Sequence, residues 1–196
     1  MLDIKKAFPA LRESLESYSI ISDETWNDLK EISTFRSLSK HSCLYRAGEA
    51  PNSFAYVYQG LIRCFVSDEK GNEYNKNFFG EGMFPGAMTA LLTSTVSTLT
   101  FEAVEDALII EIDFSAYRKL MIAKDDLKLF QIYYLEKNWL LAKDAREIEI
   151  VQDDATTRYL HFIEQYPNLV ERLPQYHIAS HLGITPTQLS RIRKKL

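Results

Sequence analysis

The chain has 196 residues, of which 46% are hydrophobic and 26% are charged, and its net charge is −4. This is an ordinary soluble globular composition with enough residues for a sizeable core in one or two domains. The N-terminus starts no signal peptide and no apolar run approaches membrane length, so we expect a cytoplasmic protein with no membrane partner.

The chain contains two cysteines, Cys43 and Cys64, both in apolar, strand-like surroundings. Two buried, reduced thiols are the expectation for such a protein. A four-cysteine iron–sulfur site within one chain is excluded, and a Cys43–Cys64 redox pair is the alternative that the sequence leaves open.

Helical patterns open the chain over 3–17 and 23–36, and Ser22 or Asp23 can cap the second of them. From about 41 to 112 the segments become short and rich in β-branched and aromatic residues, with glycine-containing turns between them. Regular short strands with such turns predict a β-sandwich or barrel. The strand candidates are 56–58, 61–66, 74–79, 98–104 and 107–112.

Helix returns after Asp113, which can cap a helix over 114–122. A longer helix is predicted over 126–151, with an apolar face that is wider than a heptad seam and is interrupted at Lys137 and Asp144. A helix of this kind must bury two sides. A single core helix is one interpretation, and we favour a dimerisation helix that packs on the barrel and on a second copy.

Asp154 can cap a further helix over 155–165, which Pro167 ends. The segment 152–154 is therefore the predicted boundary and hinge between a domain over 1–151 and a domain over 152–196.

Residues 173–196 show a helix-turn-helix pattern. Ile178 and Leu182 lie four residues apart and share one face of a first helix. Gly183 suits the left-handed backbone of a sharp helix end. His177 and His181 lie four apart on this helix without the glutamate of a zinc-protease pattern, and we expect them to face solvent or phosphate.

The second helix of the pattern starts at Thr185, an N-cap that Pro186 follows and that Gln188 completes as a capping box. Its buried stripe is Leu189, Ile192 and Leu196. Residues near the start of such a helix meet base edges in the major groove of duplex DNA, where glutamine suits adenine and arginine suits guanine. The candidate DNA-binding residues are Thr185, Thr187, Gln188, Arg191, Arg193, Lys194 and Lys195.

The charge distribution agrees with that interpretation. Residues 173–196 hold four basic side chains and no acidic one, whereas the rest holds the other 19 basic and all 27 acidic side chains, a balance of −8. A basic end on an acidic body is typical of a small DNA-binding domain on a larger sensor. A solvated basic helix end is the alternative.

The order of barrel, long helix and helix-turn-helix resembles the Crp/Fnr superfamily of bacterial transcription regulators over essentially the whole chain. The resemblance is carried by Gly48-Glu49, Gly60, Arg63, Gly71, Phe79-Gly80-Glu81, Glu102-Ala103 and the stretch from Ile178-Ala179 through Arg191. It implies an α+β protein with a cyclic-nucleotide-binding-type β-roll, a dimerisation helix at about 126–151 and a DNA-binding domain. The implied partners are an inverted-repeat operator in double-stranded DNA, a second copy of the chain and RNA polymerase.

The resemblance also implies effector-binding positions. The family's cyclic-nucleotide binders hold the ribose with a Gly-Glu pair, which Gly80-Glu81 matches, and the cyclic phosphate with an Arg-Ser-Ala-like triplet. The corresponding triplet starts at Ser97-Thr98 and has no arginine. An arginine–phosphate contact contributes ~1.5–3 kcal/mol, so we expect cyclic AMP to bind poorly unless Lys76, Arg63 or Lys143 replaces the arginine. The effector, if there is one, is then another small molecule.

Two further function classes compete with a DNA-binding regulator. A metal-dependent cupin enzyme needs clustered histidines on the strands, but only His41 of the four histidines lies in the barrel region, so we expect neither an enzyme nor a metal site. A regulatory module that acts only through protein contacts is the stronger alternative. The sequence ends at the predicted recognition helix without the β-hairpin wing of many relatives, so we expect fewer phosphate contacts.

Overall fold

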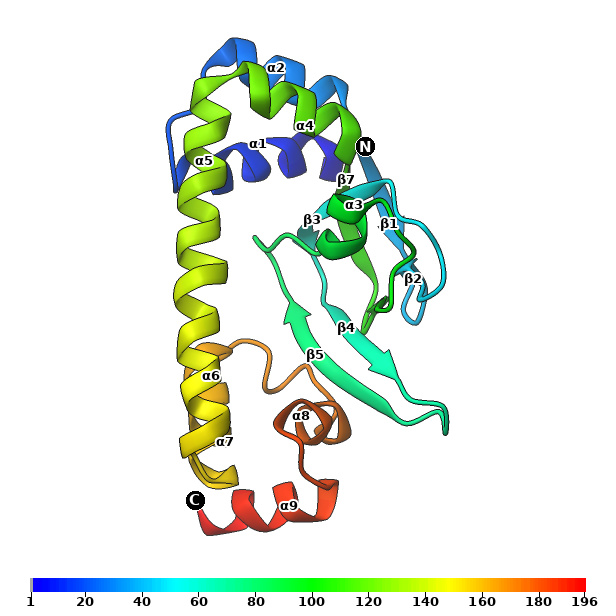
Figure 1. Cartoon of the computed structure of the whole chain (residues 1–196), viewed down its shortest axis with the longest axis vertical. Coiled ribbons are helices and arrows are strands. Elements are labelled where there is room, and N and C mark those ends of the chain that lie inside the picture. The colour runs from blue at the N-terminus through cyan, green and yellow to red at the C-terminus, as the bar shows by residue number, and fades with distance from the viewer. Residues whose placement is uncertain (1) are drawn as a thin grey trace.

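The computed structural model describes residues 2–196, with the side chains of 4–144, 146–149 and 151–196. Met1 of the predicted first domain lies outside the described residues. Figure 1 shows helices packed on one end of a β-structure, a long helical column along its side and three helices at the other end. None of the described helices combines the length and the apolar character that crossing a membrane requires.

The N-terminal helices are α1 (Leu2–Glu16) and α2 (Asp23–Glu31). Ser22 caps α2 by accepting a hydrogen bond from the Thr25 amide. The predicted extension of this helix to residue 36 is wrong, because Ser33–Leu38 form strand β1. Pairing of all six residues with strand β7 decides their conformation, so a tertiary contact overrides the local pattern.

The strands form two antiparallel sheets with the orders β1-β7-β3 and β2-β6-β4-β5. The sequence predicted five of these strands, with ends shifted by a few residues, and missed β1 and β2. The strands other than β1 are β2 (Cys43–Tyr45), β3 (Ser53–Gln59), β4 (Ile62–Ser67), β5 (Glu73–Phe79), β6 (Thr100–Ala103) and β7 (Ala107–Asp113).

A core of buried side chains fills the space between the two sheets and makes them a β-roll. Val57, Ile62, Phe101 and Ile109 are at most 1% exposed in this core. A short helix, α3 (Met88–Thr93), follows Ala87 and contributes Ala90 to the same core. Helix α3 was not predicted from the sequence, because Ala87 offers no side-chain cap that would mark its start.

The long helix runs without a break from Asp125 to Gln152, as α5 (Asp125–Leu135), a π-helical segment η1 (Glu136–Leu141) and α6 (Ala142–Gln152). It follows α4 (Phe114–Ala123), which Asp113 caps as predicted. Leu127 and Phe130 of α5 are buried in a core shared with α1, α2 and strands β3 and β7. The predicted interruption at Lys137 falls within η1.

The C-terminal unit comprises α7 (Ala155–Gln165), α8 (Gln175–Leu182) and α9 (Pro186–Lys195). Asp154 caps α7 as predicted, through the amides of Thr156 and Thr157. Among the described residues, the buried apolar side chains of this unit form a core together with the β-roll. Its apolar side chains, including Phe162 and Ile178, share one buried cluster with Leu61, Phe78 and Val104 of the β-roll.

Candidate functional sites

The free end of the C-terminal unit is built by α8, a short turn and α9. Gly183 ends α8 with a left-handed backbone, φ +68°. Thr185 caps α9 and forms the predicted capping box with Gln188. Ile178, Leu182 and Leu189 are buried where the two helices cross. The local chemistry that the sequence indicated is therefore present in this segment.

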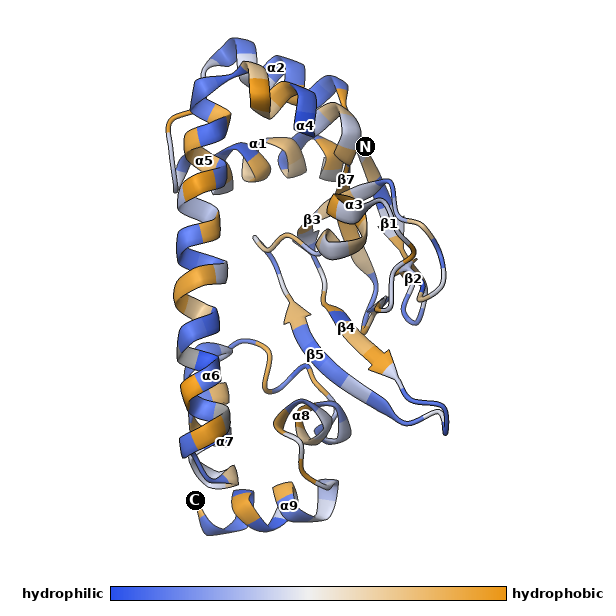
Figure 2. Ribbon diagram, in the orientation of Figure 1, coloured by the Kyte–Doolittle hydropathy of each residue, from blue (hydrophilic) through white to orange (hydrophobic). Residues whose placement is uncertain are grey.

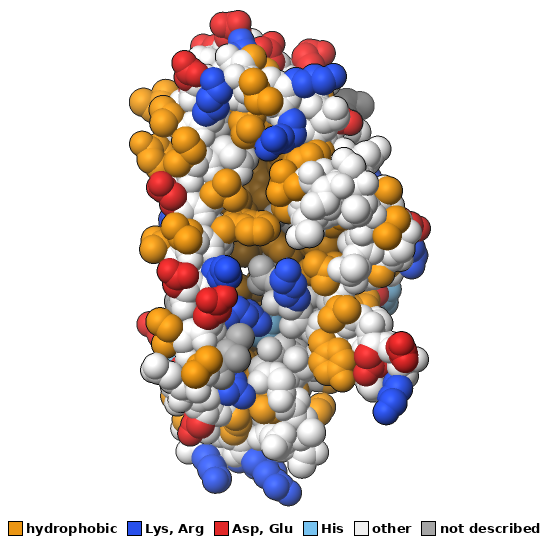
Figure 3. Space-filling view, viewed as in Figure 1, with side chains coloured by type: hydrophobic (Ala, Val, Ile, Leu, Met, Phe, Trp, Pro, Cys, Tyr) orange, Lys and Arg blue, Asp and Glu red, His pale blue; other side chains and the backbone are white. Residues whose placement is uncertain are grey.

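The outer face of α9 is polar and basic. Thr187, Arg191 and Lys195 are exposed, as are Arg193 and Lys194. Among the described residues, no acidic side chain pairs with any of these four cations. Figure 3 shows blue side chains at the end of the molecule where Figure 1 places α9, and a group of red side chains at the opposite end, near α2. This surface carries uncompensated positive charge, which suits a polyanion.

In the capping box, the side-chain oxygen of Gln188 already accepts hydrogen bonds. This atom, Oε1, accepts them from the Thr185 amide at 2.8 Å and the Thr185 hydroxyl at 3.1 Å. A bidentate contact with adenine needs both the oxygen and the nitrogen of the amide, so Gln188 must leave the cap to make one. Arg191 has no such competing partner among the described residues.

The four candidate effector residues do not converge on one site. Gly80 faces the C-terminal unit, since a Cβ built there would lie 3.2 Å from Leu169. Glu81 accepts a hydrogen bond from the Gly60 amide at 2.9 Å and pairs with both terminal nitrogens of Arg172, at 2.9 and 3.0 Å. The carboxylate thus faces the segment between α7 and α8.

Arg172 completes an ion-pair cluster that sequence reasoning missed. It pairs with Glu105 as well as Glu81. Partial burial opposes ionisation of Glu81, but the hydrogen bonds from Arg172, the backbone hydrogen bonds, including the one from Gly60, and the Arg172 charge together outweigh it and lower the pKa of this carboxyl. The same bonds, to Glu81 first and to Glu105, raise the pKa of Arg172. Any ligand that used Glu81 would have to displace Arg172.

Ser97 and Thr98 lie in another part of the β-roll. The Ser97 hydroxyl donates to the Leu99 carbonyl at 2.8 Å and accepts from the Leu99 amide at 3.0 Å. Ser97 is 3% exposed, whereas Thr98 is exposed. Ser97 is therefore committed to its own turn and carries no charge for a phosphate.

The interior of the β-roll is occupied by apolar side chains, with Ala87 and Phe101 buried in it and Leu99 packed against it. Two surface hollows of about 250 and 290 Å³ lie over β1 and β7 and beside α3. They are smaller than the ~300–1,000 Å³ of common ligand pockets. Neither is lined by Gly80, Glu81, Ser97 or Thr98.

Helix α8 packs on β5 through buried polar groups. His177 Nδ1 lies 3.2 Å from the amide nitrogen of Asn75, and His181 Nδ1 lies 3.1 Å from the Asn75 carbonyl. His177 is 6% exposed and His181 is half-buried. The expectation that these histidines face solvent or phosphate is therefore wrong, because the helix turns them toward the β-roll.

Arg63 lies at the centre of this interface. It is 4% exposed, pairs with Glu73 on β5 and Glu102 on β6, and stacks on the Phe65 ring at 3.9 Å. Two carboxylates and an aromatic face satisfy its charge, so Arg63 is not free to bind a phosphate. The position of Arg63 on a strand was predicted from the sequence. Its carboxylate partners were not, because they lie on other strands that the fold brings beside β4.

The two cysteines are free thiols on opposite faces of their sheet. Cys43 pairs with Glu102 and Cys64 with the adjacent Phe101, and neighbouring strand residues point to opposite faces. A disulfide between them would require the strands to rearrange. Burial raises the pKa of Cys64 to about 12 and also raises that of Cys43, which disfavours thiolate chemistry.

Apolar side chains also cover the outer side of the long helix. Ile132, Trp139, Leu141 and Ile148 are 49–65% exposed and Val151 is 83% exposed. In Figure 2 orange and blue segments alternate along the whole helix, and Figure 3 shows the orange side chains along its outer edge. An exposed apolar strip of this length is typical of a protein–protein contact.

Comparison with known proteins identifies one domain of this chain and a fold that it shares with solved structures. Residues 35–124 match the cyclic nucleotide-binding domain. No curated protein matches the sequence at a significant level. Solved structures do match the fold, each at low sequence identity.

The c-di-GMP-responsive global regulator CLP of Xanthomonas campestris superposes with a TM-score of 0.69 at 18% identity, over 89% of this chain and 91% of CLP. FixK2 of Bradyrhizobium japonicum gives 0.71 at 18% identity, over 84% of each chain. A CooA variant of Carboxydothermus hydrogenoformans gives 0.66 at 20% identity, over 86% of this chain and 78% of CooA.

Proposed function

We propose that this chain, which contains a cyclic nucleotide-binding domain and has the fold of the Crp/Fnr regulators, is a dimeric DNA-binding transcription regulator. The observation that carries the proposal is the uncompensated basic face of α9, which follows α8 across a glycine turn at the free end of the molecule. In the proposed roles, residues 1–151 are the sensor with its dimerisation helix and 152–196 are the DNA-binding domain.

In this proposal α9 is the recognition helix of a helix-turn-helix. Arg191, with Thr187 beside it, faces base edges, and Gln188 contributes only where it leaves its capping box. Arg193, Lys194 and Lys195 contact phosphates, and Thr185 holds the helix start in place. The uncompensated charges of α9 support this assignment, since phosphate contacts require free cations.

Dimerisation completes the DNA-binding surface. A single α9 offers few contacts, whereas two copies related by a two-fold axis present two helices to an inverted repeat with half-sites ~34 Å apart. The exposed apolar strip of the long helix, including Leu141 and Ile148, is the proposed contact between the copies.

Control by cyclic AMP is not part of the proposal. The carboxylate of Glu81 is paired with Arg172, Ser97 brings no cation, and apolar side chains fill the β-roll. The proposed regulator therefore responds to another effector or to none. An effector that bound Gly80 and Glu81 would act by competing with Arg172.

The competing hypothesis is a regulatory module that works only through protein contacts, and duplex binding separates the two. Selection of binding sites from random duplexes should give an inverted repeat for the wild type. Arg191→Ala should lose ~1–3 kcal/mol on that sequence and relax base choice at one position of each half-site. Lys195→Ala should weaken all duplexes alike and flatten the salt dependence.

Lys30→Ala, on α2, is the control for a general change in net charge and should leave the selected motif unchanged. A double variant, Lys30→Ala with Lys195→Ala, gives the level of weak duplex binding. If the wild type selects no motif and binds duplexes no better than this double variant, the protein-contact module is favoured. If Arg191→Ala selects the same motif with undiminished preference, the proposed orientation of α9 is wrong.

A further inference from the structure

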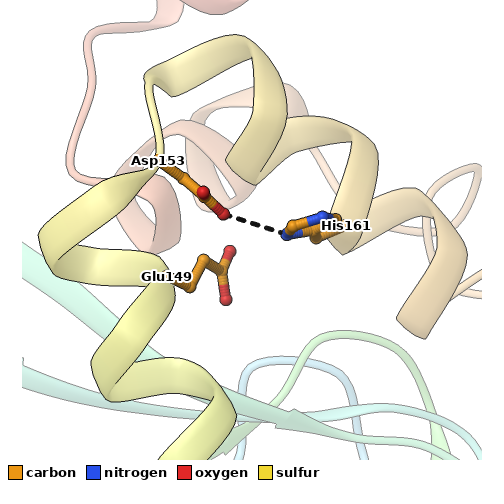
Figure 4. A group of neighbouring side chains, drawn as sticks. All are labelled: Glu149, Asp153 and His161. Carbon is orange, nitrogen blue, oxygen red and sulfur yellow. Dashed lines mark ion pairs between the residues drawn. The ribbon is translucent and has the colours of Figure 1, made fainter.

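A carboxylate–histidine group lies where the long helix meets the C-terminal unit. Glu149 and Asp153 come from the end of α6 and are one helical turn apart, and His161 comes from the second turn of α7 (Figure 4). One ligand atom from each of the three residues lies within 4.8 Å of the other two. The group thus joins two helices that the chain connects only through Asp153 and Asp154.

The spacing of the group suits a metal ion. A metal 2.0–2.2 Å from two ligand atoms holds those atoms about 3–4 Å apart. The Oδ2 atom of Asp153 and the Nδ1 atom of His161 are already 3.2 Å apart. Glu149 has a long side chain at the helix surface, so a rotation about its own bonds can bring its carboxylate to the same point.

The electrostatics of the group also call for a cation. Its two carboxylates lie at the C-terminal end of α6, where the helix dipole adds further negative potential. Among the described side chains, no hydrogen bond or ion pair reaches the Glu149 carboxylate. The His161 side chain is 51% exposed, so an ion can enter from solvent.

We propose that Glu149, Asp153 and His161 bind a divalent first-row transition metal, such as Mn²⁺, Fe²⁺, Co²⁺, Ni²⁺ or Zn²⁺. One imidazole with two carboxylates suits these ions better than Mg²⁺ or Ca²⁺, which prefer oxygen ligands alone. Three protein ligands leave further coordination positions for water. This site reverses the expectation of no metal that the histidine count gave, because His161 lies outside the β-roll.

Metal binding fixes the angle between α6 and α7. The bond to His161 bridges the predicted hinge at 152–154, so the bound ion sets the orientation of α9 relative to the dimerisation strip. This regulatory consequence rests on the proposed function, whereas metal binding itself does not. In this mechanism the metal ion is the effector, and it binds at the hinge rather than in the β-roll, because apolar side chains fill the interior of the β-roll.

Calorimetric titration of the full-length, untagged protein with Ni²⁺ tests the site. We expect one ion per chain, and His161→Ala, Asp153→Asn and Glu149→Gln should each weaken binding at least about tenfold, since even outer-shell changes cost that much. His41→Ala is the matched control, because His41 is an exposed histidine 3.7 Å from a single carboxylate, Glu102. It should bind Ni²⁺ like the wild type.

A second measurement covers the case in which a variant folds poorly. Mn²⁺ added to the wild type should broaden the NMR signals of 149–161 selectively, while those of His41 and its neighbours stay sharp. Absence of Ni²⁺ binding by the wild type, equal binding by His161→Ala, or broadening centred elsewhere would each overturn the site.

Duplex binding with and without Ni²⁺ tests the regulatory consequence. The affinity of the wild type should change with the metal and that of His161→Ala should not. If the wild type binds the metal and the duplex but the two do not influence each other, the hinge mechanism is wrong and the site stands. If no duplex binds at all, the proposed function fails, and calorimetry still decides the site.

Discussion

The hydrogen-bond partners of His177 and His181 on α8 decide which ring nitrogen of each carries the proton. His177 Nδ1 faces two donors, the amide of Asn75 and the Arg63 guanidinium, so this nitrogen is the acceptor of a neutral ring. His181 receives a hydrogen bond from Arg146 on Nε2. A second proton on either ring would face an arginine inside the interface between the C-terminal unit and the β-roll.

Acidification should therefore loosen this interface. Burial first, and then the charge of Arg63, lowers the pKa of His177 to about 4, and burial and Arg146 lower that of His181 to about 4, both from 6.5. Because both pKa values are lower in the folded than in the unfolded protein, the two neutral histidines contribute their full share of the free energy of unfolding above pH 6.5. That contribution is lost as the pH falls toward 4. Between pH 7 and pH 5 the loss should be about 2 kcal/mol per histidine.

Urea unfolding at the two pH values measures this loss. His177→Gln and His181→Asn should each reduce the pH dependence, even though they lower stability at pH 7. Equal stability of the wild type at pH 5 and pH 7 would show that these rings do not stay neutral in the fold.

Cyclic AMP should bind poorly, and single residues explain why. Ser97 bonds to its own turn where an anionic phosphate requires arginine, and Arg63 is held by two carboxylates. The missing charge-assisted contact corresponds to ~1.5–3 kcal/mol. Calorimetry with cyclic AMP should give no low-micromolar binding. Tight binding that disappears on Glu81→Ala would mean that Arg172 gives up Glu81 and that another cation serves the phosphate.

At the scale of elements, the long helix has one buried apolar face and one exposed apolar face. Its first part is buried on the N-terminal helices, whereas η1 and α6 expose Leu141 at 65% and Ile148 at 58%. A π-helical segment changes the direction of the side chains that follow it, and such segments are frequent at functional sites. The apolar strip beyond η1 therefore turns away from the core that α5 contacts.

Charged residues in the strip should produce monomers. In a two-fold contact each substitution occurs on both copies, so Leu141→Glu with Ile148→Glu removes apolar contacts of about 1.5–3 kcal/mol per side chain and adds repulsion. Sedimentation should change from dimer to monomer at micromolar concentration. Ile20→Glu is the control, since Ile20 is 85% exposed and lies outside the strip. A wild type that sediments as a monomer would contradict the proposed dimer.

Local chemistry made most elements predictable. Ser22, Asp113, Asp154 and Thr185 cap the helices that the sequence assigned to them, because a cap depends on neighbours within four residues. β1, β2 and α3 were missed because they depend on distant partners. β1 is specified by all six of its pairings with β7, and no cap marks the start of α3.

The candidate sites divide in the same way. The basic face of α9 could be predicted, because its spacing is set within a single helix. The pairing of Glu81 with Arg172 could not, since 91 residues separate the two. The metal ligands were missed for a related reason, because Asp153 and His161 meet only when the hinge folds α7 back beside α6.

At the scale of the whole molecule, the C-terminal unit packs on the β-roll through a shared buried core, so it is held by more than the connecting segment of the chain. Leu61, Phe78 and Val104 of the β-roll complete its apolar core, and His177 lies in the polar interface beside them. The unit cannot move as a rigid body without exposing this cluster. Any change in the orientation of α9 must therefore offset the loss of these contacts.

Arg172 should contribute measurably to this attachment. It is 27% exposed and joins the segment before α8 to Glu81 and Glu105 of the β-roll. Charge-assisted bonds at a partly exposed site stabilise by about 1–3 kcal/mol. Arg172→Ala should raise the amide exchange rate of α8 and α9 by roughly tenfold for each 1.4 kcal/mol lost, and it should leave the exchange of β3 and β7 unchanged.

The matched control is Arg12→Ala, at an arginine that is 30% exposed and also pairs with two carboxylates, Glu16 and Asp23. Because these partners lie within the N-terminal helices, this variant should not change the exchange of α8 or α9. Glu81→Gln should reproduce part of the Arg172→Ala effect, since it removes one partner and leaves Glu105. If exchange in α8 is the same in the wild type and in Arg172→Ala, the shared apolar core alone holds the C-terminal unit, and a ligand at Glu81 could not release α9 by displacing Arg172.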